Sequence, residues 1–255
     1  MKQQAALTIE RPKWHWHRWM LILASLAGQQ AVHAAEPSPL LIVAPTSQSM
    51  PMLRMAKDEP VDGVLKDLGE MLAQRLGLKP VFVALPSKRA GTAVASGAAD
   101  LLCYVKPEWL EGKVLWTRLF LSGTGIIAAG SNTPEVAQLQ ALADEPLGTV
   151  LGYHYPALEL AFRQQVRRAD GPDAETNLRR LTYGRVRYAV TDRAALAYYL
   201  KANPDAGLRE ILEVEHYQLG CALTPGKMAL LPPLNKAIDR MVADGSLETL
   251  LKRYR

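Results

Sequence analysis

Val61 to Val105 reads VDGVLKDLGEMLAQRLGLKPVFVALPSKRAGTAVASGAADLLCYV, and its pattern of apolar residues predicts the fold class. Apolar residues recur three or four positions apart from Val64 to Leu76, which predicts a helix that packs one face on a sheet. Val81 to Leu85 is a nearly unbroken apolar run, as in a strand covered by helices on both faces. A second helix between Ser87 and Gly97 leads to a third apolar run, Leu101 to Val105. This alternation predicts a doubly wound α/β fold, in which ligands bind beyond the carboxyl ends of the strands.

The N-terminal 34 residues have the pattern of a secretory signal peptide. Basic residues precede the apolar run Trp19 to Gly28, and Val32-His-Ala34 supplies small residues before a cleavage site, which we place after Ala34. The apolar run is far shorter than the roughly 20 residues that a membrane span requires. The mature protein is therefore expected in the periplasm, with an uncleaved anchor as the alternative.

The basic charge of the chain comes largely from this leader. Residues 1–34 hold four Lys or Arg and one Glu, a net charge of +3, so the formal +5 of the whole chain falls to +2 after cleavage. A nucleic-acid-binding protein would require a basic face or clustered cations. We therefore expect no nucleic-acid partner.

Two cysteines, Cys103 and Cys221, lie in apolar, strand-like runs. An oxidising periplasm permits a disulfide between them. Sequence alone does not place their Cα atoms within bridging distance, so two buried free thiols are the favoured expectation and a disulfide is the alternative.

The same alternation of strands and helices begins again after the small-residue run Ser122 to Gly125. The second half has strand patterns at Ile126–Ala129, Leu147–Leu151 and Val186–Val190, and helix patterns at Thr133–Leu142, Ala157–Arg168, Asn177–Tyr183 and Ala194–Ala202. Extended stretches and a pair of amphipathic helices complete the chain. Two copies of one pattern around a small-residue joint predict two lobes with a cleft between them.

Catalytic and metal-binding motifs are missing from the sequence. It contains no His-Glu-x-x-His, Gly-x-Ser-x-Gly or Ser-x-x-Lys pattern. After the leader, only His154 and His216 remain, too few and too isolated for a zinc site. We expect no catalytic residues, no metal and no cofactor. Asp192 follows a strand, so its carboxylate either faces a ligand or caps the next helix.

The order of motifs resembles that of the family 3 extracellular solute-binding proteins, the periplasmic receptors of polar amino-acid ABC importers. The resemblance spans the mature chain and is carried by Gly63–Leu68, Ala73–Leu78, Ala95–Asp100, Leu147–Gly152, Gly184–Asp192 and Asp244–Tyr254. It implies two α/β lobes joined by two crossovers. Lobe 1 would hold residues 35–122 and 217–255, lobe 2 residues 126–213, and the crossovers residues 123–125 and 214–216, which would act as a hinge.

The residues with which the family holds its ligand are only partly present. An arginine usually follows the third strand and clamps the ligand's α-carboxylate, but this chain has Lys106, which lacks the planar two-donor fork. The family's Gly-Thr pair in the second lobe becomes Gly152-Tyr153. Asp192 remains at the position that often receives the ligand's amino group. An amine-bearing ligand with some apolar surface is favoured because aromatic faces attract cations. The predicted ligand-binding residues are Met50, Met52, Tyr104, Glu108, Trp109, Tyr153, His154, Tyr155 and Asp192.

The resemblance implies a monomeric, non-enzymatic binding protein. It would capture a small polar or amine-bearing solute between its lobes and deliver it to an inner-membrane ABC permease. Two alternatives remain open. One is a dehydratase of the cyclohexadienyl type, in which Glu108, Glu159 or Asp192 would act as a general acid or base. The other is a ligand-sensing receptor that has no permease.

Overall fold

A computed structural model describes residues 38–163 and 165–255. The signal peptide predicted at residues 1–34 lies outside the described residues. Within the described part of the chain, no helix is long and apolar enough to cross a membrane.

The sheet of lobe 1 is built on three parallel strands. β1 (Pro39–Pro45) lies between β4 (Lys79–Leu85) and β5 (Leu101–Val105). The C-terminal end of β11 (Leu208–Leu223) pairs antiparallel with β5 and also with the short β6 (Leu115–Trp116). The three apolar runs near the start of the chain are therefore neighbouring strands, and their carboxyl ends meet at one edge.

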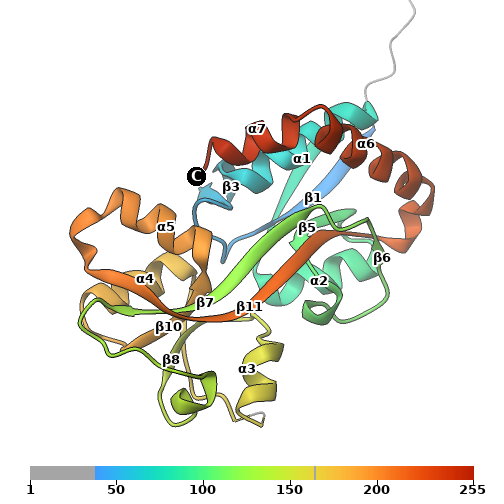
Figure 1. Cartoon of the computed structure of the whole chain (residues 1–255). Helices are drawn as coiled ribbons and strands as arrows, with labels where there is room; N and C mark the ends of the chain where they lie inside the picture. The colour runs from blue at the N-terminus through green and yellow to red at the C-terminus, as the bar shows by residue number, and fades with distance from the viewer. Residues whose placement is uncertain (1–37, 164) are drawn as a thin grey trace, which may run out of the picture. The chain divides into compact units, whose positions relative to one another are not determined.

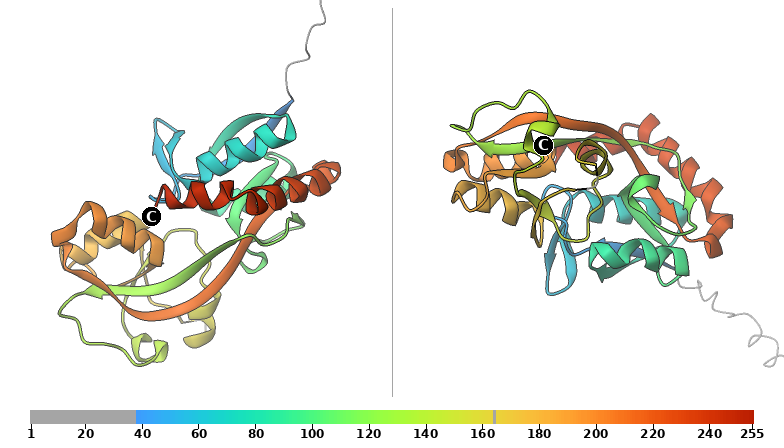
Figure 2. Two further views of the ribbon diagram at one scale, coloured as in Figure 1. Left: turned by 45° about the horizontal axis from the view of Figure 1, so that its top comes forward. Right: turned by 90° about the horizontal axis from the view of Figure 1, so that it is seen from below.

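Helices cover both faces of this sheet (Figure 2). α1 (Val64–Leu76), α6 (Leu231–Ala243) and α7 (Ser246–Lys252) pack on one face, against β1 residues such as Ile42. α2 (Ser87–Ser96) packs on the other face. Successive side chains of a strand point to opposite faces, so β1 contributes to both cores. The doubly wound arrangement predicted from the sequence is confirmed.

Lobe 2 repeats this plan with a second sheet. Its strands, in spatial order after β11, are β7 (Leu121–Gly130), β10 (Tyr188–Asp192), β8 (Leu147–Val150) and β9 (Arg168–Gly171). α3 (Pro156–Ala161) packs on one face, and α4 (Ala174–Thr182) and α5 (Arg193–Ala202) pack on the other. The two-lobed α/β fold expected from the sequence is confirmed.

The remaining elements are short. A hairpin precedes α1, and single turns of 3-10 helix follow several strands. Their bounds are β2 (Arg54–Ala56), β3 (Glu59–Asp62), η2 (Pro107–Trp109), η3 (Leu139–Leu142), η4 (Pro204–Ala206) and η5 (Pro225–Leu230).

Two long antiparallel strands connect the lobes (Figure 1). β7 and β11 pair from Leu121 opposite Leu219 to Gly130 opposite Leu208. The register shifts between Glu210 and Leu212 and again between Glu213 and Glu215, so one extra residue interrupts the ladder at each place. Such a bulge bends a strand locally.

Two helices predicted in the second half are wrong. The helix expected over Ala157–Arg168 ends at Ala161, and β9 forms instead as a parallel edge strand on β8. The Arg168 guanidinium supports that strand by donating to the carbonyls of Val150 and Tyr153 at 2.9 and 3.0 Å.

The helix expected over Thr133–Leu142 is reduced to η3. Arg209 donates at 2.8 Å to the Thr133 carbonyl, an acceptor that the first turn of the expected helix would use.

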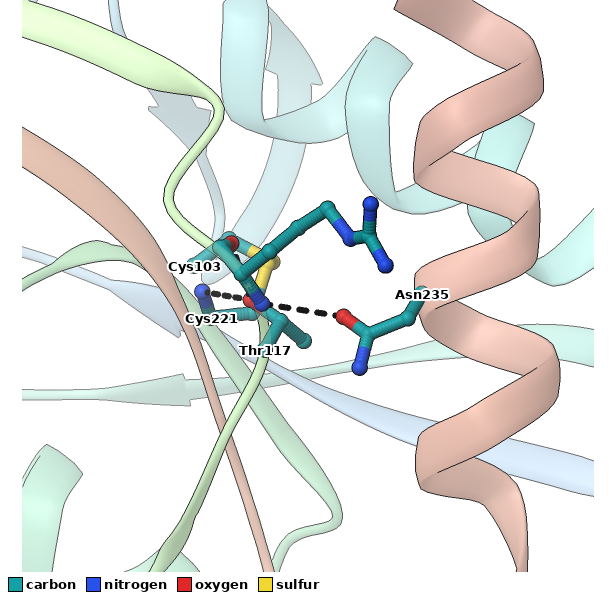
Figure 3. Close-up of a disulfide and its surroundings, with 5 residues drawn as sticks. Cys103, Thr117, Cys221 and Asn235 are labelled. Carbon is teal, nitrogen blue, oxygen red and sulfur yellow. Dashed lines mark hydrogen bonds between the residues drawn. A yellow bond between two sulfur atoms is a disulfide. The ribbon is translucent and has the colours of Figure 1, made fainter.

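The expectation of two free thiols is also wrong, because Cys103 and Cys221 form a disulfide (Figure 3). The two residues lie opposite each other on the antiparallel strands β5 and β11. Direct neighbours on such strands have closely spaced Cβ atoms, which the sequence could not reveal. Beside the bridge, the Cys221 N–H donates to the Thr117 hydroxyl at 2.8 Å. The backbone N–H of Arg118, the residue after Thr117, donates to Asn235 Oδ1 on α6.

Candidate functional site

A cavity of about 160 Å³ lies between the lobes. Lobe 1 contributes the loop after β1, the start of α2 and the end of β5, and lobe 2 contributes the ends of β8 and β10. The site thus forms where the carboxyl ends of the parallel strands meet, as doubly wound sheets predict. Its volume suits a small solute.

Most of the residues selected from the sequence line this cavity. They are Met52, Tyr104, Trp109, Tyr153, His154, Tyr155 and Asp192. Two do not. Met50 packs against the core of lobe 1, and Glu108 is exposed on η2. η2 presents the Trp109 side chain to the cavity and leaves the Glu108 side chain in solvent.

Asp192 both caps a helix and faces the cavity. Its Oδ1 accepts from the Ala194 N–H at 2.8 Å, which caps α5. Its Oδ2 accepts from the Tyr104 hydroxyl at 2.9 Å and from the Tyr217 hydroxyl. The structure therefore confirms that Asp192 caps the next helix, and the same carboxylate joins lobe 2 to tyrosines of β5 and β11 at the cavity.

The backbone is shaped to permit this three-residue network. Tyr104 adopts a left-handed conformation with φ 64°, which is uncommon for a residue with a large side chain. Gly123 on β7 lies directly beside the network. A Cβ atom at Gly123 would collide with the Tyr217 ring and lie 2.9 Å from Asp192 Oδ2. Glycine is required here by the close approach of three side chains.

The tyrosines of the network act as neutral hydrogen-bond donors. Burial, reinforced by the nearby charge of Asp192, raises the pKa of Tyr104 well above its ordinary value. Burial likewise raises the pKa of Tyr217, with further contributions from Tyr104 and Asp192. Both hydroxyls therefore stay protonated at neutral pH and orient the Asp192 carboxylate.

Aromatic residues and one further carboxylate border the cavity. Trp109 and Tyr217 meet edge to face with ring centroids 5.1 Å apart. Glu215, two residues before Tyr217 on β11, also lines the cavity and pairs with Lys106 at 2.7 Å. Among the cavity-lining residues that the structure describes, there is no arginine, in agreement with the gap noted in the sequence.

Two buried polar atoms in residues lining the cavity have no hydrogen-bond partner among the described residues. They are Trp109 Nε1 and Thr191 Oγ1. Buried polar atoms normally find partners. A ligand oxygen would satisfy Trp109 Nε1, which can only donate.

Sequence reasoning missed several lining residues. The important ones are Gln48, Ser87, Thr191, Glu215 and Tyr217. Glu215 lies in the predicted crossover and Tyr217 directly after it, and their spacing of two puts both side chains on one face of an extended strand. That periodicity, at a predicted joint between lobes, was the available signal. Metal binding finds no support within the described residues, which contain no cluster of three or more His, Cys, Asp or Glu suited to an ion.

A two-lobed α/β fold with a cavity between its lobes is the architecture of the periplasmic binding proteins. The chain belongs to the bacterial extracellular solute-binding proteins, family 3, whose family model matches residues 41–255. No curated protein matches the chain.

Solved structures share the fold. An ancestral arginine-binding protein bound to arginine is 22% identical with a TM-score of 0.73, and the match covers 86% of this chain and 99% of that one. The arginine-, lysine-, histidine-binding protein ArtJ from Geobacillus stearothermophilus is 16% identical with a TM-score of 0.73 over 85% of this chain and 95% of that one. The ancestral amino acid-binding protein AncCDT-1, a precursor of cyclohexadienyl dehydratase, is 22% identical with a TM-score of 0.71 over 85% and 95%.

Proposed function

We propose that this protein captures a small amine-bearing solute in the cavity between its lobes, without chemical change. One observation carries the proposal: the cavity is lined by the Asp192 carboxylate and by five aromatic side chains, with no arginine among the described lining residues. Carboxylates and aromatic faces attract ammonium groups. A ligand whose binding depends on an arginine that clamps its carboxylate would find no such bidentate donor among the described lining residues.

The predicted ligand-binding residues divide into two roles in this proposal. Asp192 receives the amine through the remaining acceptor position on its carboxylate, since three hydrogen bonds already use part of its capacity. Trp109, Tyr153 and Tyr155 enclose the apolar part of the ligand. Met52 and His154 border the remaining wall. Met50 and Glu108 are left out of the proposed site because they do not line the cavity.

Ligand would bind by closing the two lobes. We assign the hinge to residues 123–125 and 214–216, between lobe 1 (35–122 and 217–255) and lobe 2 (126–213). The register shift between Glu213 and Glu215 supports this position because a bulge weakens the ladder locally. A ligand that contacts both lobes favours the closed form by its differential affinity.

The cellular role follows from the family. After export and cleavage at Ala34, the monomeric protein would act in the periplasm and deliver its solute to an inner-membrane ABC permease. A receptor that reports the same ligand to a sensor is the alternative.

The first test is a thermal-shift screen against primary amines, polyamines, quaternary amines, amino acids, organic acids and prephenate. A ligand at a hundredfold excess over its dissociation constant stabilises the native state by about 2.7 kcal/mol. We expect amines to raise the melting temperature and organic acids to leave it unchanged. Stabilisation by acids alone would refute the amine assignment.

A pair of matched variants then locates the binding site. Asp192→Asn keeps the α5 cap but removes the charge, and it is expected to weaken amine binding at least tenfold in titration calorimetry. Asp173→Asn is the control, because Asp173 caps α4 in the same way without lining the cavity. Equal losses in the two variants would show that the effect is not specific to the carboxylate in the cavity, and would contradict the assignment of the amine to Asp192.

A dehydratase is the second candidate, favoured by the likeness to AncCDT-1. Asp192 would then serve as the general acid or base. Loss of prephenate with release of carbon dioxide would support this activity, and recovery of unchanged prephenate would exclude it.

A further inference from the structure

Lys106 places its ammonium group in an aromatic and acidic pocket at the edge of the cavity. Its Nζ lies 2.7 Å from Glu215 Oε2, 5.2 Å from the Trp109 ring centroid and 5.6 Å from the Tyr217 ring centroid. The Lys106 side chain is only 13% exposed and that of Glu215 is 25% exposed. A cation within about 6 Å of two ring centroids is attracted by both rings.

The three partners of Lys106 all line the cavity, whereas Lys106 itself does not. They are also held in place without it. Trp109 and Tyr217 contact each other edge to face, and the Tyr217 hydroxyl is bound to Asp192. Glu215 and Tyr217 share one face of β11. Trp109, Tyr217 and Glu215 thus form a binding site for an ammonium ion, and the Lys106 side chain occupies it.

We propose that Trp109, Tyr217 and Glu215 form a second subsite specific for a primary ammonium, which Lys106 occupies in this structure. Lys106 thereby sets the number of cationic groups that the site accepts. With Lys106 in place, the site takes a ligand with one ammonium group, at Asp192. Without it, an external alkylammonium can enter. This inference rests on the proposed function for its relevance to the ligand, but the subsite can be tested independently.

The test is chemical rescue with n-butylammonium, which reproduces the lysine side chain. Lys106→Ala removes the occupant, and n-butylammonium at millimolar concentration is expected to raise its melting temperature by several degrees and to change Trp109 fluorescence. Wild type and Lys113→Ala, a change at an exposed lysine, should show neither effect. Butanol and butyrate should not substitute for the cation. Equal responses of all three proteins, or no response of Lys106→Ala, would overturn the proposal.

A double variant tests the subsite itself. Lys106→Ala combined with Glu215→Gln should lose the rescue, since the carboxylate that pairs with the ammonium is gone. Rescue that survives in the double variant would contradict a subsite built on Glu215.

A second measurement does not depend on the folding of Lys106→Ala. Glu215→Gln alone keeps the lysine but removes its ion-pair partner, so acetylation of Lys106 by an amine-reactive reagent should accelerate severalfold and approach the rate of Lys113. An unchanged rate would show that Glu215 does not hold Lys106. If amines fail to bind the wild type while rescue succeeds, only the proposed function falls. If amines bind and rescue fails, only the subsite falls.

Discussion

Gly123 shows how one residue supports the site without contacting a ligand. Gly123→Ala would force a methyl group against Tyr217, Asp192 and Tyr104. We expect a loss of about 1–3 kcal/mol in the free energy of unfolding, typical of overpacking, together with weaker ligand binding. Urea denaturation measures the first effect.

Gly125→Ala is the matched control, two residues along the same strand. Its added Cβ would lie 3.5 Å from Glu215 Cγ, an ordinary contact. Similar destabilisation of the two variants would mean that loss of glycine from β7, rather than the crowding at Gly123, is responsible.

Tyr155 gives the protein a predictable response to alkali. Burial raises the pKa of Tyr155 to about 12, above its ordinary value near 10. The neutral form is therefore favoured by folding, and its contribution to stability is complete below about pH 10 and lost as the pH rises toward 12. The contribution amounts to at most about 3 kcal/mol.

Urea denaturation at several pH values between about 8 and 12 checks this contribution. Tyr155→Phe should start less stable, because the Val150 N–H loses its acceptor, but should lose less stability as the pH rises. Tyr183→Phe, at an exposed tyrosine, should follow the wild type. Parallel curves for all three proteins would contradict the assignment.

The sequence predicted which loops meet at the site better than it predicted which side chains point inward. Tyr104, Trp109 and Asp192 lie at or just beyond the carboxyl ends of strands with plain apolar runs, so their place at the cavity could be expected. Glu215 and Tyr217 could not be placed in the same way, because they come from a strand that pairs with different partners in the two lobes.

At the level of elements, the disulfide ties β5 to β11. Cys103 and Cys221 are 118 residues apart. In the chain-entropy model, a bridge across so long a loop stabilises the native state by about 5 kcal/mol. The double variant Cys103→Ser/Cys221→Ser should lose a large part of this stability in urea denaturation, and a reducing agent should destabilise only the wild type.

The control for this prediction is Thr117→Val, beside the bridge. It removes the hydroxyl that accepts from the Cys221 N–H but leaves the sulfurs joined. Thr117→Val should lower the free energy of unfolding by about 1–3 kcal/mol, as for a buried donor left without its partner. A double serine variant as stable as the wild type would show that strand pairing alone fixes β5 and β11.

Strongly apolar elements were predictable, and polar edge elements were not. β1 and β5 coincide with apolar runs because both of their faces are covered. β4 was also found from its apolar run, although it is an edge strand in which Val81 is exposed. β9 was missed because it is a polar edge strand that contains Arg168 and Asp170. It is held by pairing with β8 and by the Arg168 guanidinium. Such tertiary contacts override local helix patterns.

At the scale of the whole molecule, the Tyr104–Asp192 hydrogen bond holds the lobes together. A hydrogen bond to a charged group contributes about 1.5–3 kcal/mol, so Tyr104→Phe should shift the closed-to-open ratio by about tenfold to a hundredfold. Small-angle X-ray scattering of the ligand-free variant should show a larger radius of gyration than that of the wild type.

Tyr199→Phe serves as the comparison, since the Tyr199 hydroxyl bonds to Thr182 within lobe 2. It should scatter like the wild type. An unchanged radius for Tyr104→Phe would mean that other contacts keep the lobes closed.

The path of the chain through the two lobes also sets an order for folding during synthesis. The core of lobe 2 draws on residues between Ile126 and Ile211, a continuous segment. The core of lobe 1 joins Leu40 to Tyr254, whose hydroxyl donates to Asp67 at 2.9 Å. A nascent chain can therefore fold lobe 2 before α6 and α7, which cover the early strands of lobe 1, have been translated. Until these helices have been translated, the apolar face of β1 and α1 stays uncovered, and a chaperone that binds apolar segments would act at this stage.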